Sequence, residues 1–405
     1  MTSRLAPPHC VLLQNLQATF ARLWPDDAPA LAVRAPGRAN LLGGHVDMHG
    51  GLVINVALDR GVWLVAAPVA DDVSTLYAAD LDARITLSHD LPSLAARRDA
   101  TGMPLPDWAR YPAAVLWALH QHGLAVPGLR GVFAGDLPIG AGLSSSAALE
   151  VALAMAWSAR SNWALAPAEL AALTQQAERE YLGLGIGIQD QFTALHARQG
   201  NALWLDCRSL EHKHIPLPEA VTVVICDTNT RRVLTGSGYG HRARDAHEAA
   251  RVIQGRDPAV RSLRDVTPER LEEHRLVLSE AQYRRARHVV SEIARVQRAA
   301  TMLRQGDVET FGALMNESYR SARDDYGSSS PALDAMWTAT TAQPGCYGAR
   351  YSGGGEAGAV VALVASERVP DFVAGAAVVY EHLTGHQGTF FPVHPATRAE
   401  VYECL

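Results

Sequence analysis

The spacing of hydrophobic residues along the chain predicts a mixture of helices and strands. Several segments carry apolar residues every three or four positions, the pattern of a helix with one buried face. Other segments are apolar, β-branched runs bounded by turn residues, which is typical of strands. The predicted helices occupy residues 10–24, 108–122, 146–160, 167–182, 188–198 and 370–383. The predicted strands occupy residues 31–35, 52–69, 131–135, 202–206 and 220–227.

The pattern changes in the second half of the chain. Residues 238–306 are rich in Arg, Glu and Ala with apolar residues at helical spacing. A strand, a glycine turn and a second strand follow over 347–366, and 387–403 contains a predicted edge strand. Because helices and strands do not alternate strictly, we expect an α+β fold rather than a doubly wound sheet.

Length and composition indicate a folded protein of more than one domain. The chain has 405 residues, which at about 150 residues per domain allows two or three. Hydrophobic residues make up 48% and charged residues 19%, which suits a large core and is too little charge for a disordered chain. Since Pro216 and Pro218 interrupt the pattern, we predict an N-terminal domain over 1–210 and a C-terminal domain over 211–405.

The charged residues exclude several functions. The net charge is −6, so no basic surface points to nucleic acid. The chain contains a single lysine, Lys213, in a polar segment with histidine on both sides. A Walker A loop and a protein-kinase site each require a lysine in a different context, so neither can be built here. Any phosphate would have to be held by backbone amides, arginines and a metal ion.

The five cysteines are dispersed and form no C-x-x-C pair, which predicts reduced thiols rather than a disulfide framework or a zinc site. They are Cys10, Cys207, Cys226, Cys346 and Cys404. The N-terminus lacks the pattern of a signal peptide, and no apolar run reaches the roughly 18 residues that span a bilayer. We expect a soluble cytoplasmic protein that binds neither membrane nor nucleic acid.

A loop of glycines and serines over 138–150 is the strongest chemical feature. Gly140 and Gly142 allow tight turns and close approach to a ligand, and the serines at 144–146 can cap the helix that follows. The free N–H groups and the dipole of that helix favour an anion. The segment therefore predicts a phosphate loop, although a capped helix without a ligand would share this pattern.

Two further glycine-rich segments leave alternatives open. Residues 353–358 match G-x-G-x-x-G, but a strand follows over 360–364 where a dinucleotide-binding fingerprint needs a helix. This segment is either a hairpin turn or a backbone wall around phosphates. Residues 34–51 place Arg, Asn, Asp and two His between apolar strands, which indicates either a satisfied polar turn or a small-ligand site.

Together these three segments resemble the GHMP kinase superfamily, and among its members the galactokinases. The resemblance is carried by residues 36–47, 138–148 and 348–355, with galactokinase-like matches at 107–111, 176–178, 187–192 and 226–232. It implies a two-domain α+β GHMP kinase fold with the active site in the interdomain cleft. It also implies a sugar 1-kinase that uses ATP and Mg²⁺ to make an α-sugar 1-phosphate from a galacto-configured sugar.

The resemblance also implies roles for individual residues. Asp190 matches the general base, and Arg38 matches the arginine that keeps it ionised and stabilises the transferred phosphoryl group. Ser145 and Glu178 match the ligands of Mg²⁺. The implied sugar contacts are Gly44, His45, Asp47, Gly187 and Tyr239. The implied ATP contacts are Gly140, Gly142, Leu143, Ser144, Ser145, Ser146, Ala147, Gly353 and Gly355.

The chain departs from the galactokinase pattern at Gly44, where the family has a glutamate that reaches the hydroxyl on carbon 6 of galactose. Losing this acceptor should open space and weaken galactose binding by roughly 1.5–3 kcal/mol. We therefore expect a sugar altered at carbon 6, such as arabinose, galacturonate, or a longer-chain sugar or its phosphate. His45 and His49, with arginines nearby, would help to bind an anionic substituent. The alternative is an ordinary galactokinase in which another residue holds carbon 6.

Two other functions are less well supported by the sequence. A non-catalytic sugar and ATP sensor would tend to lose catalytic residues, whereas Arg38, Asp190 and the serine loop are intact. Mevalonate-type phosphorylation fits poorly with Asp47, which suits a hydroxylated substrate, and with the match at 227–229. Both a monomer and a homodimer are compatible with the sequence.

Overall fold

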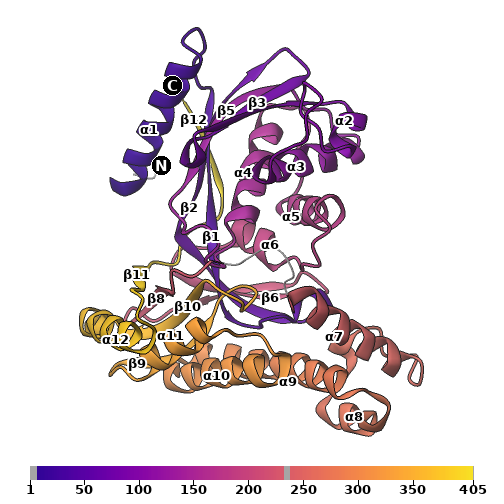
Figure 1. Cartoon of the computed structure of the whole chain (residues 1–405), viewed down its shortest axis with the longest axis vertical. Helices are drawn as coiled ribbons and strands as arrows, with labels where there is room; N and C mark the ends of the chain where they lie inside the picture. The colour runs from indigo at the N-terminus through magenta and orange to yellow at the C-terminus, as the bar shows by residue number, and fades with distance from the viewer. Residues whose placement is uncertain (1–6, 232–237, 405) are drawn as a thin grey trace.

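The computed structural model of the chain describes residues 7–231 and 238–404. Within them, the strands form a larger sheet of eight strands and a smaller sheet of four, with helices packed on both (Figure 1). Most of the larger sheet comes from the indigo to magenta part of the chain, with the yellow strand β12 at its edge, and the smaller sheet combines the pink strand β8 with the orange and yellow strands β9, β10 and β11. The fold is a mixture of α and β elements, as the sequence predicts.

The larger sheet has the order β12-β1-β2-β5-β3-β4, with β6 pairing β2 and β7 pairing β6. Its neighbours are antiparallel except β3 and β5, which are parallel. Every residue of β1 is buried, because β12 and β2 flank this strand and α4 and α6 pack against it. The strands are β1 (Leu31–Leu42), β2 (Leu52–Val69), β3 (Val73–Ala78), β4 (Ala83–Ser88), β5 (Gly128–Gly135), β6 (Asn201–Asp206), β7 (His212–Pro216) and β12 (Glu400–Glu403).

The smaller sheet has the order β11-β8-β10-β9 and is antiparallel throughout. Its central strand β10 reads Ala-Val-Val-Ala-Leu-Val-Ala and is buried along its whole length. Such an unbroken apolar run is what a strand covered on both faces requires. The strands are β8 (Val221–Asp227), β9 (Cys346–Tyr351), β10 (Ala359–Ala365) and β11 (Thr389–Val393).

Helices cover the two sheets on different sides. In Figure 1, α3, α4 and α5 lie on one side of the larger sheet and α1 on the other, while α9 and α10 lie along the smaller sheet. In the first half these are α1 (Pro7–Leu23), α2 (Leu91–Ala95), α3 (Arg110–Gln121), α4 (Ser145–Ala159), α5 (Pro167–Gln176) and α6 (Gln189–His196). In the second half they are α7 (Gly238–Gln254), α8 (Pro268–Glu273), α9 (Glu280–Gln305), α10 (Val308–Ser321), α11 (Pro331–Thr341) and α12 (Val369–Thr384). Within the described ranges, none of them has the length and hydrophobicity to cross a bilayer.

Two expectations about the elements need correction. Residues 36–42, which we expected in a polar loop, continue strand β1 as far as Leu42. The predicted edge strand in 387–403 is two strands: β11 joins the smaller sheet, and β12 returns to the larger one beside β1 (Figure 1). Since β7 and β12 both follow residue 210, the larger sheet extends beyond the predicted boundary between 1–210 and 211–405.

Candidate active site

Arg38 and Asp190, the two predicted catalytic residues, face each other. Arg38 projects from β1, and Asp190 lies in the first turn of α6. Nε and Nη2 of Arg38 each donate to a different carboxylate oxygen of Asp190 at 2.8 Å. The hydroxyl of Ser144 donates to the same carboxylate at 2.5 Å. The Asp190 side chain is still 24% exposed, so the held carboxylate remains accessible to a substrate.

Arg38 also joins the two sheets. Its Nη1 donates to the carbonyl oxygen of Gly142 at 2.8 Å and to Oγ of Ser352 at 3.2 Å. Its backbone N–H donates to the carbonyl oxygen of Leu143 at 3.0 Å. Strand β1, the serine loop and the end of β9 therefore meet at this arginine, and the candidate site takes residues from both sheets.

The two glycine turns that were predicted to contact ATP lie against each other. Gly142 has φ +75°, and a Cβ there would lie 2.5 Å from the carbonyl oxygen of Ser352. A Cβ on Gly353, at φ +81°, would lie 2.8 Å from Cα of Gly142. Only glycine fits this contact at these backbone angles. The contact brings residues 140–147 and 353–355 together at the N-terminus of α4, where backbone amides favour an anion.

Glu178 lies near this helix start, in the turn that follows α5, and is buried. Nε2 of Gln191 donates to its carboxylate at 2.8 Å, and the hydroxyl of Ser146 also hydrogen-bonds it. Burial, and then the charge of Asp190, raises the pKa of Glu178 to about 7. The resemblance implies Ser145 as the magnesium ligand beside Glu178; the structure brings Ser146 to the carboxylate, and the role of Ser145 stays a prediction.

The oxygen donors beside α4 fit a magnesium ion of the kind that keeps several waters. Glu178 and Ser146 supply a carboxylate and a hydroxyl at the edge of the phosphate loop. In the described part of the chain, no group of three His, Cys, Asp or Glu residues is arranged to hold a metal ion. An ion held here would therefore complete its coordination with phosphate oxygens and water.

The predicted sugar residues Asp47 and Gly187 are adjacent. A Cβ on Gly187 would lie 2.3 Å from the carboxyl group of Asp47, so this contact requires glycine. Nε2 of Gln189 donates to Asp47 at 3.0 Å. Burial, and then the charge of Asp190, raises the pKa of Asp47 to about 6. Asp47 is therefore a hydrogen-bond acceptor that lies close enough to Arg38 and Asp190 for their charges to affect its pKa.

Both histidines of the first segment are buried, and burial lowers the pKa of each, which weighs against our expectation that they help to bind an anion. A ring nitrogen of His45 lies 2.9 Å from the hydroxyl of Tyr351, and the His45 ring stacks on Tyr326. Burial lowers the pKa of His45 well below its usual range. Burial, with His247 beside it, lowers the pKa of His49 to about 3. The side chain of Tyr239, in the first turn of α7, lies outside the described residues.

The space beside Gly44 is filled, which corrects the expectation that the loss of a side chain at this position opens space. A Cβ on Gly44 would lie 2.1 Å from Nη2 of Arg350, the buried arginine of β9. The place that a side chain would take is occupied by a guanidinium group.

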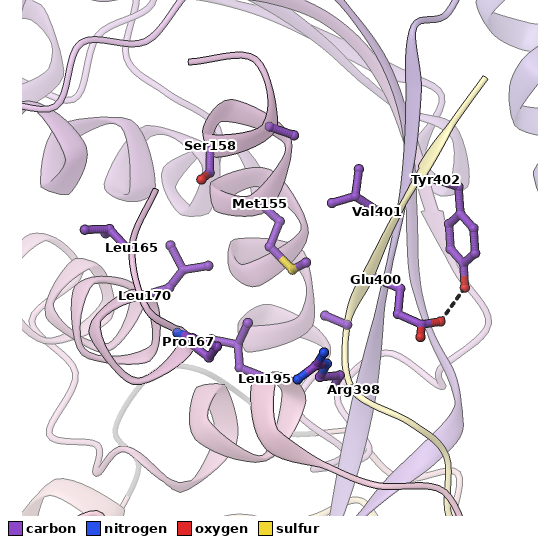
Figure 2. Close-up of a pocket in the computed structure, with 12 residues that line it drawn as sticks. Met155, Ser158, Leu165, Pro167, Leu170, Leu195, Arg398, Glu400, Val401 and Tyr402 are labelled. Carbon is purple, nitrogen blue, oxygen red and sulfur yellow. Dashed lines mark hydrogen bonds between the residues drawn. The ribbon is translucent and has the colours of Figure 1, made fainter. Parts of the chain in front are cut away.

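A separate surface cavity of about 620 Å³ lies between α4, α5 and β12 (Figure 2). Met155 and Leu170 face Val401 across it, and Arg398 lies at one end beside Leu195. None of the predicted site residues lines this cavity. The cavity lies beside the C-terminal ends of α4 and α6, and the N-terminal ends of these two helices carry the candidate active site.

Several residues that hold the predicted site residues in place are not themselves among the predicted ones. Gln189 and Gln191 bond Asp47 and Glu178, yet only Asp190 between them was assigned a role. Ser352 and Arg350 lie within the matched segment 348–355 but were not singled out. These residues lie in segments that match the family motifs, but their contacts depend on how β1 and β9 pack together.

Comparison with known proteins agrees with this geometry. Residues 18–68 match the galactokinase galactose-binding signature, 110–198 the N-terminal domain of GHMP kinases and 299–378 their C-terminal domain. The chain is 40% identical over 363 residues to galactokinase from Roseiflexus sp. (strain RS-1), covering 90% of each. It is 39% identical over 381 residues to galactokinase from Homo sapiens, covering 93% of each.

A solved structure supports the same relationship. The fold is similar to Lactococcus lactis galactokinase complexed with galactose, with a TM-score of 0.89 and 30% sequence identity. The match covers 96% of this chain and 99% of that one. The likeness extends over both sheets and therefore over all the elements that meet at Arg38. The chain is a sugar kinase, which transfers phosphate to a sugar hydroxyl, and it belongs to the galactokinase branch of the GHMP kinase superfamily.

Proposed function

We propose that this protein transfers the terminal phosphate of ATP to the C1 hydroxyl of galactose. The observation that carries the proposal is the Asp190 carboxylate, held by Arg38 and Ser144 between the phosphate loop and Asp47. A group that removes a proton must be accessible and correctly aimed, and three donors fix the direction of this carboxylate. The match of residues 18–68, which include Asp47, to the galactose-binding signature supports a sugar beside this carboxylate.

Each held group has a chemical task in this reaction. Asp190 takes the proton of the C1 hydroxyl, and Arg38 stabilises the charge on the phosphoryl group that is transferred. Asp47 accepts hydrogen bonds from ring hydroxyls and so orients the sugar. The backbone amides at the start of α4 hold the phosphates of ATP, with the 353–355 turn as the facing wall.

Magnesium would be held on the phosphate side of the site. Glu178 and a serine of the loop, Ser146 or the predicted Ser145, would supply the protein ligands. The ion would neutralise phosphate charge, a role that matters in a chain without a lysine in the loop.

Galactose is favoured over a sugar altered at carbon 6. Arg350 fills the space beside Gly44, which argues against a longer substituent. His45 and His49, two of the groups expected to bind an anion, are buried, and burial lowers the pKa of both. The relatives at about 40% identity are named galactokinases. We therefore favour the ordinary galactokinase over our first expectation.

The test is ADP release with Mg-ATP across a panel of galactose, arabinose, galacturonate and galacto-configured heptoses. We expect galactose to give the highest kcat/KM. A heptose or galacturonate that exceeds galactose by orders of magnitude would reject galactose as the substrate and leave the sugar kinase assignment in place. A panel with no turnover at all would instead favour the non-catalytic sensor.

A further inference from the structure

Arg350 is a buried cation with an unused hydrogen-bond donor, Nε. It lies on β9 and is only 1% exposed. Its Nη1 donates to the backbone and side-chain oxygens of Asn40. Its Nε is buried and has no hydrogen-bond partner among the described residues. Since an unpaired buried donor costs free energy, this guanidinium would be stabilised by a further acceptor.

The nearby acidic side chain is already engaged elsewhere. Glu292 of α9 accepts from the backbone N–H of Gly43 at 2.8 Å and from Oγ of Ser318 at 2.6 Å. It also pairs with Arg295. Among the residues that the structure describes, no carboxylate forms an ion pair with Arg350. Burial accordingly lowers the pKa of this guanidinium from its usual value.

The Nη2 end of the guanidinium faces Gly44, within the segment that matches the galactose-binding signature. Arg350 is also linked to the sugar residue Asp47. The amide of Asn40 donates to Oε1 of Gln189 at 3.2 Å, and Nε2 of Gln189 donates to Asp47 at 3.0 Å. Arg350 is therefore part of the same hydrogen-bonded unit as Asp47.

We propose that Arg350 binds the oxygen carried by carbon 6 of the sugar, from the place that a side chain at position 44 would otherwise take. The inference rests on the proposed function, because it puts C1 at Asp190 and the ring hydroxyls at Asp47. The far end of the sugar, with its C5 substituent, then lies towards the turn at 43–45. An arginine donates hydrogen bonds and accepts none, so it favours a sugar that carries an oxygen there.

The test compares galactose with L-arabinose, which shares the ring configuration but lacks carbon 6. The readout is the ratio of kcat/KM for the two sugars, because a general loss of folded or active protein cancels in it. In Arg350→Met we expect the ratio to fall about 10- to 100-fold, mainly through a higher KM for galactose. Arg34→Met is the matched control: Arg34 is also buried, but on β1 with Nη2 bonded to Leu58, and its loss should leave the ratio at the wild-type value.

Gly44→Ala tests the same contact without removing the charge. The added methyl group would displace Nη2, the end of a flexible side chain, so the protein should fold and the ratio should again fall. This variant decides the matter if Arg350→Met does not fold. A ratio that stays at the wild-type value in active Gly44→Ala protein would overturn the role of Arg350 while leaving galactose as the substrate. Wild-type protein that phosphorylates neither sugar would reject the proposed function itself.

Discussion

At the scale of single residues, the site is organised around one carboxylate. Asp190 receives two hydrogen bonds from Arg38 and one from Ser144, all at 2.8 Å or less. These donors fix its direction, while a quarter of the side chain stays open to a ligand. A base in this position needs both features, because it has to meet a hydroxyl that lies in line with the phosphate donor.

Asp190→Asn should lower kcat by about 10²- to 10⁴-fold, because an amide cannot take up the hydroxyl proton. The measurement is steady-state ADP release with galactose and Mg-ATP, together with thermal unfolding to show that the variant is folded. Glu180→Gln, a change at an exposed acid near the site in sequence, is the control and should keep wild-type turnover. Turnover in folded Asp190→Asn close to that of wild type would remove Asp190 as the base.

The sequence predicted these residues better than it predicted their supports. Arg38 and Asp190 were found because each lies in a segment that resembles a known motif. Arg350 was not found, because its contact with Gly44 joins residues more than 300 positions apart, one in the turn after β1 and the other on β9. The absence of a side chain at Gly44 was visible in the sequence, but what fills the space depends on the packing of β9 against β1.

At the scale of elements, two glycine turns contact each other at the candidate nucleotide site. Gly142 and Gly353 approach each other closely enough that a single Cβ on either would collide with backbone atoms. The turn that contains Gly142 leads into α4, and the turn that contains Gly353 links β9 to β10. Their contact therefore sets how the start of α4 sits relative to the smaller sheet.

Gly142→Ala should lower kcat/KM for ATP by about tenfold or more, because the two turns must separate and the loop amides move. Gly306→Ala is the matched control. Gly306 has the same φ of +75°, but a Cβ there would meet nothing within 4 Å. Both variants should lose about 1 kcal/mol of stability from the positive φ, and only Gly142→Ala should lose ATP turnover. Equal kinetics in the two variants would show that the close contact does not matter for ATP.

The elements themselves were well predicted where their pattern is unbroken. The strand predicted over 52–69 is β2 with the same limits, and the helix predicted over 146–160 is α4, shifted by one residue. The prediction failed for β1 beyond residue 35, because Arg38 and Asn40 are polar although they are buried. Residues that serve a site interrupt the hydrophobic pattern on which the prediction depends.

At the scale of the whole molecule, the site gathers carboxyl groups that the fold must bury together. Burial and the neighbouring Asp190 raise the pKa of Asp47 to about 6 and that of Glu178 to about 7. The pKa of Glu178 is near 4.5 in the unfolded chain and about 7 in the folded chain. At a pH between these two values, Glu178 binds a proton in the folded chain but not in the unfolded one. Its stabilising contribution is complete below pH 4.5 and is lost as the pH rises through 7.

We therefore expect Glu178→Gln to have a more stabilising effect on the ligand-free protein at pH 8 than at pH 5. The difference between its effects on the free energy of unfolding at the two pH values should be on the order of 2 kcal/mol. The measurement is urea unfolding of both proteins at the two pH values without nucleotide or magnesium. Comparing the variant with wild type at each pH removes the contribution of the buried histidines, which titrate in the opposite sense. A difference between the two proteins that does not change with pH would contradict the raised pKa.

For the whole molecule we propose that the chain phosphorylates galactose on C1 with Asp190 as the base. The most direct measurement is ³¹P and ¹H NMR of the product formed from galactose and Mg-ATP, with Asp190→Asn run in parallel. We predict a single sugar phosphate, α-galactose 1-phosphate, formed by the wild type and strongly reduced in the variant. Phosphate on any other hydroxyl, or no sugar phosphate from folded wild-type protein, would contradict the account.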